Sequence, residues 1–132
     1  MNLENVLAEF ERAKKALRAA QILHADGLLE DTVSRSYYAV MHAARAALLV
    51  HDVIPTSHAA VRRLFGAVLV RPGLIEEAWA AVLAREQDQR VAADYSVHTT
   101  WELEAVAHLV DDAQAFMQRI RDYLVHVGIS VV

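Results

Sequence analysis

The most informative stretch of the sequence is Ser34-Arg35-Ser36-Tyr37-Tyr38-Ala39-Val40-Met41-His42-Ala43-Ala44-Arg45, which lies inside a long helical pattern. A helix advances by about 100° per residue, so Arg35 and His42, seven positions apart, point in the same direction. Tyr38 lies between them on that side, and Arg45 extends the row by almost one more turn. We call these four residues, Arg35, Tyr38, His42 and Arg45, the polar strip. They predict a helix that presents a polar row beside its apolar, core-facing side.

The composition predicts an all-α protein. Hydrophobic residues make up 55% of the 132 residues, and only 4 Gly and 2 Pro interrupt them. This length suits one domain, residues 1–132, with a core of its own. No apolar run approaches the roughly 20 residues of a membrane span, and the N-terminal residues lack the order of a signal peptide. With no Cys to form disulfides, the sequence predicts a cytoplasmic protein with no membrane partner.

Apolar residues that alternate three and four positions apart predict an up-and-down helical bundle of four long helices plus one short helix. The expected helices cover residues 3–25, 30–50, 58–70 (the short one) and 74–92, and a last long helix ends before Gly128. Ser57 is the expected N-cap of the short helix, and Thr99 with Glu102 predicts a capping box at the start of the last one. Two polar segments are expected outside the core: 94–98 as a connection and 85–90 over solvent or a partner.

The charge and the missing motifs narrow the range of functions. A net charge of -4 argues against a broad basic surface for nucleic acid, so any polyanion must bind through a local patch. The His residues form no His-x-x-x-His or Glu-x-x-His spacing and there is no Cys, so the sequence predicts no metal site. It has no Gly-rich phosphate loop, which excludes a self-contained nucleotide-hydrolysing fold, and no Gly-flanked Ser as a nucleophile. No cofactor is expected.

Arg35 and His42 allow two interpretations from their chemistry alone. In the plainer one, Arg35 is half of an ion pair and His42 is hydrogen-bonded between helices. In the other, His42 takes a proton from a ribose 2′-hydroxyl or returns one to a leaving oxygen, and Arg35 holds phosphate oxygens as their charge grows. The two groups lie ~10 Å apart along one helix. They therefore bracket one phosphate only if a two-fold dimer brings two polar strips together.

The same stretch resembles the second-helix signature of the HEPN superfamily, in which an Arg is followed by four to six residues and then a His. Within that superfamily the chain is similar to small bacterial and archaeal proteins with Ser-Arg-x-Tyr-Tyr-Ala, here residues 34–39. Two further segments support the resemblance. Thr56-Ser57-His58 resembles the short Ser/Thr-His motif of that group, and Arg90-Val91-Ala92-Ala93-Asp94-Tyr95 resembles its Arg-x-x-Ala-Asp-Tyr motif. The similarity covers nearly the whole chain in order.

The resemblance implies a HEPN-like helical bundle that forms a homodimer, in which the Arg-to-His rows of two protomers make a joint cleft. Members are commonly metal-independent ribonucleases, often the toxin of a toxin–antitoxin pair whose antitoxin is a minimal nucleotidyltransferase. On that analogy His42 is general base or acid and Arg35 is the phosphate clamp. Active nucleases of the family usually carry Asn, Asp or His directly after the Arg, where this chain has Ser36. A second function therefore stays open, a non-catalytic nucleotide-binding module that partners a nucleotidyltransferase.

Four further residues are expected to support the binding of RNA or a nucleotide: Tyr38, Arg45, Asp94 and Tyr95. Tyr38 is either an ordinary buried aromatic with a bonded hydroxyl or a side chain that orients His42 or stacks a base. Asp94 either caps a helix end or, together with Tyr95, closes the cleft and pairs with Arg35. His58, at the start of the short helix, is expected to be a structural hydrogen-bonding residue.

Overall fold

A computed structural model describes residues 1–131, and every regular element in that range is a helix. The elements are α1 (Leu3–Ala25), α2 (Leu29–Val50), α3 (His58–Leu64), the π-helix η1 (Phe65–Val70), α4 (Glu77–Tyr95) and α5 (Leu103–His126). The predicted all-α fold, with four long helices and one short one, is confirmed. None of the helices in residues 1–131 has the length and apolar character needed to cross a membrane.

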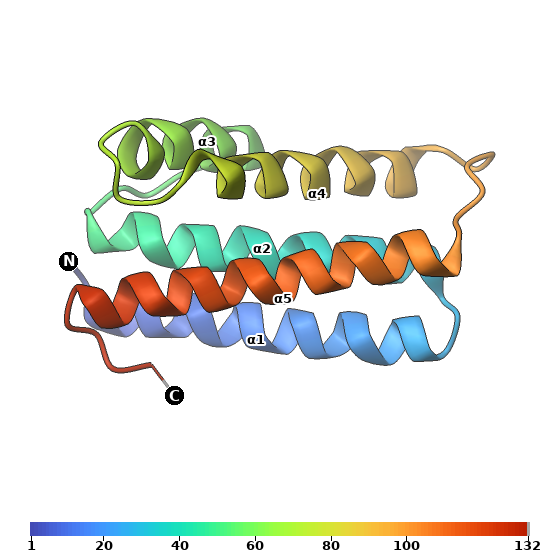
Figure 1. The fold of residues 1–132 in the computed structure, drawn as a ribbon, viewed down its shortest axis with the longest axis horizontal. Coiled ribbons are helices and arrows are strands. Elements are labelled where there is room, and N and C mark those ends of the chain that lie inside the picture. Colours follow the sequence, from blue (N-terminus) through green and yellow to red (C-terminus); the bar gives the residue numbers. More distant parts are fainter. Residues whose placement is uncertain (132) are drawn as a thin grey trace.

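The four long helices run lengthwise and alternate in direction (Figure 1). α2 packs against α1, α4 and α5 and is therefore the central helix of the bundle. α1 and α4 lie at opposite edges, and α3 and η1 sit beside the beginning of α4 (Figure 1). Because α2 has neighbours on three sides, most of its surface is core, and its polar strip has to lie where two helices leave space.

Local signals explain several helix ends. α1 has the predicted bounds. At its start the Asn2 side chain caps the helix by accepting a hydrogen bond from the Asn5 N–H. Gly27, with φ of 75°, follows its last turn and takes the left-handed conformation that stops a helix. The predicted cap of α3 is confirmed, because the Ser57 hydroxyl oxygen accepts from the Ala60 N–H at 3.0 Å.

Other ends differ from the prediction. The helix expected at residues 58–70 is α-helical only to Leu64 and continues as the wider η1. α4 starts at Glu77 and includes residues 94–95, which were expected in a connection. The capping box of α5 does not form, because Glu102 is the N-cap and makes no side-chain capping bond. Thr99, four residues before the helix begins, instead donates its hydroxyl to the Ser96 hydroxyl oxygen at 2.6 Å.

The core fills the space between α2 and the helices around it. Its large buried side chains include Phe10 of α1, Tyr37 and Leu48 of α2, Phe65 of η1 and Phe116 of α5. The Phe65 and Phe116 rings lie 5.6 Å apart, centroid to centroid, so η1 is tied to α5 by an aromatic contact. Burial of these rings is the main source of stability that holds the polar strip in position.

One carboxyl group is also buried in this core. Glu86 of α4 is only 1% exposed, although the polar run 85–90 was expected to face solvent or a partner. Its carboxyl oxygens lie 3.0 and 3.1 Å from the Ser36 hydroxyl, which in turn lies 3.1 Å from the Leu109 carbonyl oxygen. Burial raises the pKa of Glu86 to about 8, so the acid is protonated at neutral pH. It then donates to Ser36, which donates to Leu109, and all three groups are satisfied.

Candidate functional site

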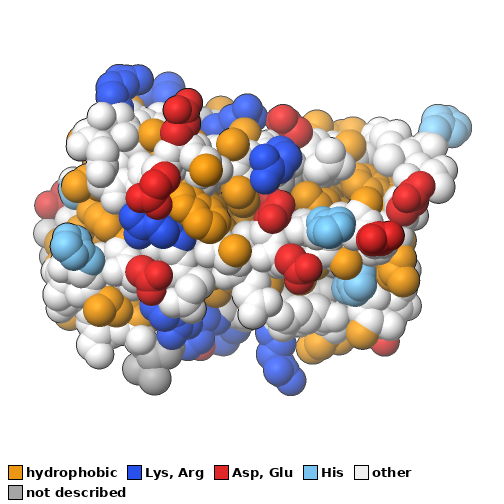
Figure 2. All heavy atoms as spheres, viewed as in Figure 1, with side chains coloured by type: hydrophobic (Ala, Val, Ile, Leu, Met, Phe, Trp, Pro, Cys, Tyr) orange, Lys and Arg blue, Asp and Glu red, His pale blue; other side chains and the backbone are white. Residues whose placement is uncertain are grey.

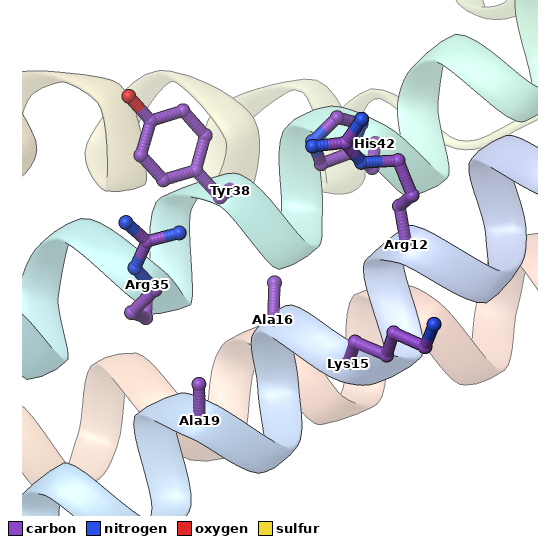
Figure 3. A pocket seen from close by; sticks show the side chains of 7 residues that line it. All are labelled: Arg12, Lys15, Ala16, Ala19, Arg35, Tyr38 and His42. Carbon is purple, nitrogen blue, oxygen red and sulfur yellow. The ribbon is translucent and has the colours of Figure 1, made fainter.

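Basic side chains gather around α1, although the chain as a whole is acidic. In Figure 2, several Lys and Arg side chains lie along the lower edge of the molecule, where α1 lies in Figure 1, and others lie at the upper edge over α3 and α4. A pocket of about 460 Å³ lies between α1 and α2, and we call it the α1–α2 pocket. It is lined by Arg12, Lys15, Ala16 and Ala19 of α1 and by Arg35, Tyr38 and His42 of α2 (Figure 3). None of these lining residues carries a carboxylate, so the pocket is locally positive and suits a phosphate group.

The pocket exists because α1 presents small side chains opposite the polar strip. Ala16 and Ala19 project only short side chains toward α2, while the longer Arg12 reaches toward His42 and Lys15 extends along α1 (Figure 3). Neither Arg12 nor Lys15 is a site residue predicted from the sequence. Their signal in the sequence is the basic run in the middle of α1.

His42 is held by a carboxylate from α1. Its Nδ1 lies 2.7 Å from Oε2 of Glu9, and both side chains are largely buried. Burial raises the pKa of the Glu9 carboxyl, but the hydrogen bond from His42 and the charge of Arg45 outweigh that effect and leave this pKa below its ordinary value. Glu9 is therefore ionised and accepts a hydrogen bond from the Nδ1–H group of His42. Nε2 is left as the nitrogen that can exchange a proton with a molecule in the pocket.

Arg45 supports Glu9 and does not line the α1–α2 pocket. Its Nε lies 3.3 Å from Oε1 of Glu9, on the other oxygen from the one that His42 contacts. The last member of the polar strip therefore acts on His42 through Glu9. The plainer interpretation of His42, a hydrogen bond between helices, describes this geometry, and the same bond also orients the ring for proton exchange.

Arg35 has no ion-pair partner within residues 1–131, contrary to the plainer interpretation of that residue. Its guanidinium carbon lies 5.0 Å from the centroid of the Tyr38 ring, a cation–π arrangement that leaves the N–H groups free. The guanidinium lies next to Tyr38 at the pocket edge (Figure 3). Arg35 can therefore donate to the oxygens of an anion bound in the pocket.

Asp94 and Tyr95 do not occupy the positions expected of them. They lie in the last turn of α4, where Asp94 pairs with Arg90 at 3.0 Å and accepts a hydrogen bond from the Ser34 hydroxyl at 3.0 Å. Within the chain the expected pair of Asp94 with Arg35 is therefore not formed, because Arg90 lies one turn before Asp94 on the same helix. Tyr95 is 80% exposed and lies outside the pocket.

Arg90 joins the three sequence motifs into one cluster behind the pocket. Its guanidinium lies 5.6 Å from the Tyr37 ring and 5.7 Å from the Tyr38 ring, and it donates to the Tyr38 hydroxyl at 3.5 Å. Tyr37 and His58 are joined at 2.6 Å. Burial raises the pKa of Tyr37 to about 12, and burial together with Arg90 lowers the pKa of His58. The phenol therefore donates to a neutral imidazole, so His58 does make a hydrogen bond, and its purely structural role stays a prediction.

Ser36 lies on the opposite side of α2 from the pocket. Its hydroxyl contacts Glu86 and Leu109, and its side chain is fully buried. Position 36, where active nucleases of the resembled superfamily usually carry Asn, Asp or His, therefore lies in the core and is not among the residues that line the α1–α2 pocket. Within residues 1–131 no three His, Asp or Glu side chains gather closely enough to hold a metal ion.

Comparison with known proteins supports the resemblance found in the sequence. The model of the HEPN domain matches residues 7–123. A protein of Methanocaldococcus jannaschii described as a putative toxin is 36% identical over 92% of this chain and 90% of its own length. A UPF0332 protein of Pyrococcus horikoshii is 37% identical over 67% of this chain and 63% of its own length. Another UPF0332 protein, from Gloeobacter violaceus, is 31% identical over 86% of this chain and 91% of its own length. The chain therefore belongs to the HEPN domain family.

Proposed function

We propose that this chain is a toxin-like HEPN protein that cleaves RNA at the α1–α2 pocket without a metal ion. The observation that carries the proposal is a pocket lined by cations and by no acidic residue, around a histidine that Glu9 orients from behind the lining. The description of the Methanocaldococcus jannaschii relative as a putative toxin supports the toxin-like part. We also propose that a minimal nucleotidyltransferase acts as its antitoxin, as the resemblance to the superfamily implies.

The chemistry uses a nucleophile that RNA itself supplies. His42 Nε2 takes the proton of a ribose 2′-hydroxyl, and the 2′-oxygen attacks the adjacent phosphorus. The bond from phosphorus to the 5′-oxygen breaks, and that oxygen leaves as a hydroxyl after receiving a proton from an imidazolium. The products are a 2′,3′-cyclic phosphate and a free 5′-hydroxyl end. Arg35 and Arg12 balance the negative charge that grows on the phosphoryl oxygens during attack.

A homodimer would complete this site. Arg35 is exposed, and Tyr38 and His42 are half-buried, so the polar strip remains accessible at the open side of the pocket. Two such strips related by a two-fold axis would supply a second imidazole, so that one takes the proton and the other returns it. The like charges that face each other would oppose the dimer unless an anion lies between them. RNA or a nucleotide is therefore expected to stabilise the pair.

A second candidate function is a non-catalytic module that binds a nucleotide and engages a nucleotidyltransferase. The size of the pocket favours it, since about 460 Å³ lies in the range of small-ligand sites. Both candidates use the same cations, but only the ribonuclease needs proton transfer at His42.

The test is RNA cleavage in EDTA, with and without the candidate nucleotidyltransferase. The ribonuclease proposal expects cleavage that survives the chelator, ends in a 2′,3′-cyclic phosphate and falls when the partner is added. Nucleotide binding with no cleavage under any of these conditions would replace it with the second candidate. Cleavage that needs a divalent cation would contradict both.

A further inference from the structure

Most of the Lys and Arg side chains that make no ion pair within residues 1–131 line two neighbouring pockets, and only Arg63 and Arg71 lie elsewhere. Within residues 1–131 ion pairs engage Lys14, Arg45, Arg62, Arg85, Arg90 and Arg119. Five other cations have no such pair in that range and line two neighbouring pockets: Arg12, Lys15, Arg18, Arg35 and Arg121. Such a concentration on a chain of net charge -4 indicates a binding surface for a polyanion.

The second pocket, of about 200 Å³, lies on the other side of α1, against α5, and we call it the α1–α5 pocket. Its polar lining includes Arg18 and Gln21 of α1 and Gln114, Gln118 and Arg121 of α5, and no lining residue is acidic. The Arg121 guanidinium carbon lies 5.3 Å from the centroid of the Phe10 ring, so this cation is held in place by packing. Amide side chains beside cations offer both donors and acceptors to a base edge.

The two pockets are joined across α1 by a row of three cations. Arg12, Lys15 and Arg18 are spaced three residues apart, and residues at that spacing are neighbours on a helix surface, about 5–6 Å apart at Cβ. Arg12 and Lys15 line the α1–α2 pocket, and Arg18 lines the α1–α5 pocket. In Figure 3, α1 separates the α1–α2 pocket from the ribbon of α5 behind it. The row therefore crosses the ridge between the two pockets.

We propose that this row carries a single strand of RNA, which enters the α1–α2 pocket and continues over α1 into the α1–α5 pocket. The inference rests on the proposed function and names its substrate as single-stranded. A helix is only about 10–12 Å wide, so a chain that enters pockets on both of its sides must bend sharply. Duplexes are stiff over roughly 150 base pairs, whereas a single strand bends freely. The phosphates follow the cations, and Gln21, Gln114 and Gln118 contact the bases.

The experiment measures binding of a fluorescein-labelled oligouridylate with 2′-O-methyl sugars, which cannot be cleaved because the 2′-oxygen is blocked. The double variant Arg18→Gln/Arg121→Gln is expected to bind at least about tenfold more weakly than the original chain at low salt. The slope of log affinity against log salt should become shallower by about 1.4, that is about 0.7 for each lost phosphate contact. The matched control is Arg63→Gln/Arg71→Gln, two exposed arginines with the same charge change that line neither pocket.

A single variant and a mononucleotide ligand complete the experiment. Arg121 packs on Phe10, so the double variant could have a lower melting temperature than the original chain. In that case the single variant Arg18→Gln tests the row, because Arg18 is exposed. Uridine monophosphate should bind all these variants equally, because it fills only the α1–α2 pocket. Loss of oligouridylate binding in the control as well, or equal binding by a duplex, would overturn the inference. Binding that depends on Arg18 without any cleavage of natural RNA would keep the inference and refute the proposed ribonuclease.

Discussion

The buried Glu86 makes stability depend on pH in a way that the substitution Glu86→Gln should remove. Burial raises the pKa of this carboxyl from 4.5 to about 8. Between these two values the folded state holds a proton that the unfolded state has lost, so stability falls as the pH rises through this window. At pH 7 the interval from 4.5 to 7 is 2.5 units, or on the order of 3 kcal/mol at 1.36 kcal/mol per unit.

The amide of Glu86→Gln stays neutral and can still donate to the Ser36 hydroxyl, so it avoids this cost without emptying the core. Urea unfolding followed by circular dichroism, from about pH 5 to about pH 8, measures the effect. The unfolding free energy of the variant minus that of the original chain should grow by on the order of 2–3 kcal/mol between about pH 5 and pH 7. All other ionisable groups are the same in both chains, so the difference isolates Glu86. Two parallel stability curves would refute a neutral, buried Glu86.

Three other predictions concern the core, the site and the assembly. Phe116→Ala should lower the free energy of unfolding by ~3–5 kcal/mol, because its ring is fully buried between η1 and α4; a loss below about 1 kcal/mol in urea unfolding would contradict this packing. Glu9→Gln should reduce RNA cleavage by about a hundredfold in an initial-rate assay, because His42 loses the carboxylate that fixes its tautomer; an unchanged rate would separate Glu9 from the chemistry. Light scattering at micromolar concentration should find a homodimer that phosphate or nucleotide stabilises, and a monomer under both conditions would remove the joint cleft.

Much of the fold followed from local patterns. The spacing of apolar residues gave the number and order of the helices, because each helix must bury one side against its neighbours. The bounds of α1 were predicted because its ends depend on nearby residues such as Gly27. The end of α4 was not predicted correctly, because Asp94 is held in the helix by Arg90 and by Ser34 of α2. A contact between residues sixty positions apart leaves no mark in a local pattern.

The same distinction explains the site. Arg35, Tyr38 and His42 could be grouped from the sequence because one helix carries all three at regular spacing. Glu9 could not be added to this group from the sequence, since nothing there indicates that α1 places a carboxylate 2.7 Å from His42. Glu86 was expected outside the core because it lies in a polar run, and only its contact with Ser36 explains its burial.

The central claim is that His42 transfers a proton during RNA cleavage that needs no metal ion. The most direct measurement is the cleavage rate of single-stranded RNA in EDTA for the original chain, for His42→Ala and for His108→Ala, an exposed histidine of α5 that lines neither pocket. We expect EDTA-resistant cleavage that falls by at least about a hundredfold in His42→Ala and is unchanged in His108→Ala. All three chains should have similar melting temperatures. Cleavage by the original chain that disappears in EDTA, or that persists in His42→Ala, would contradict the account.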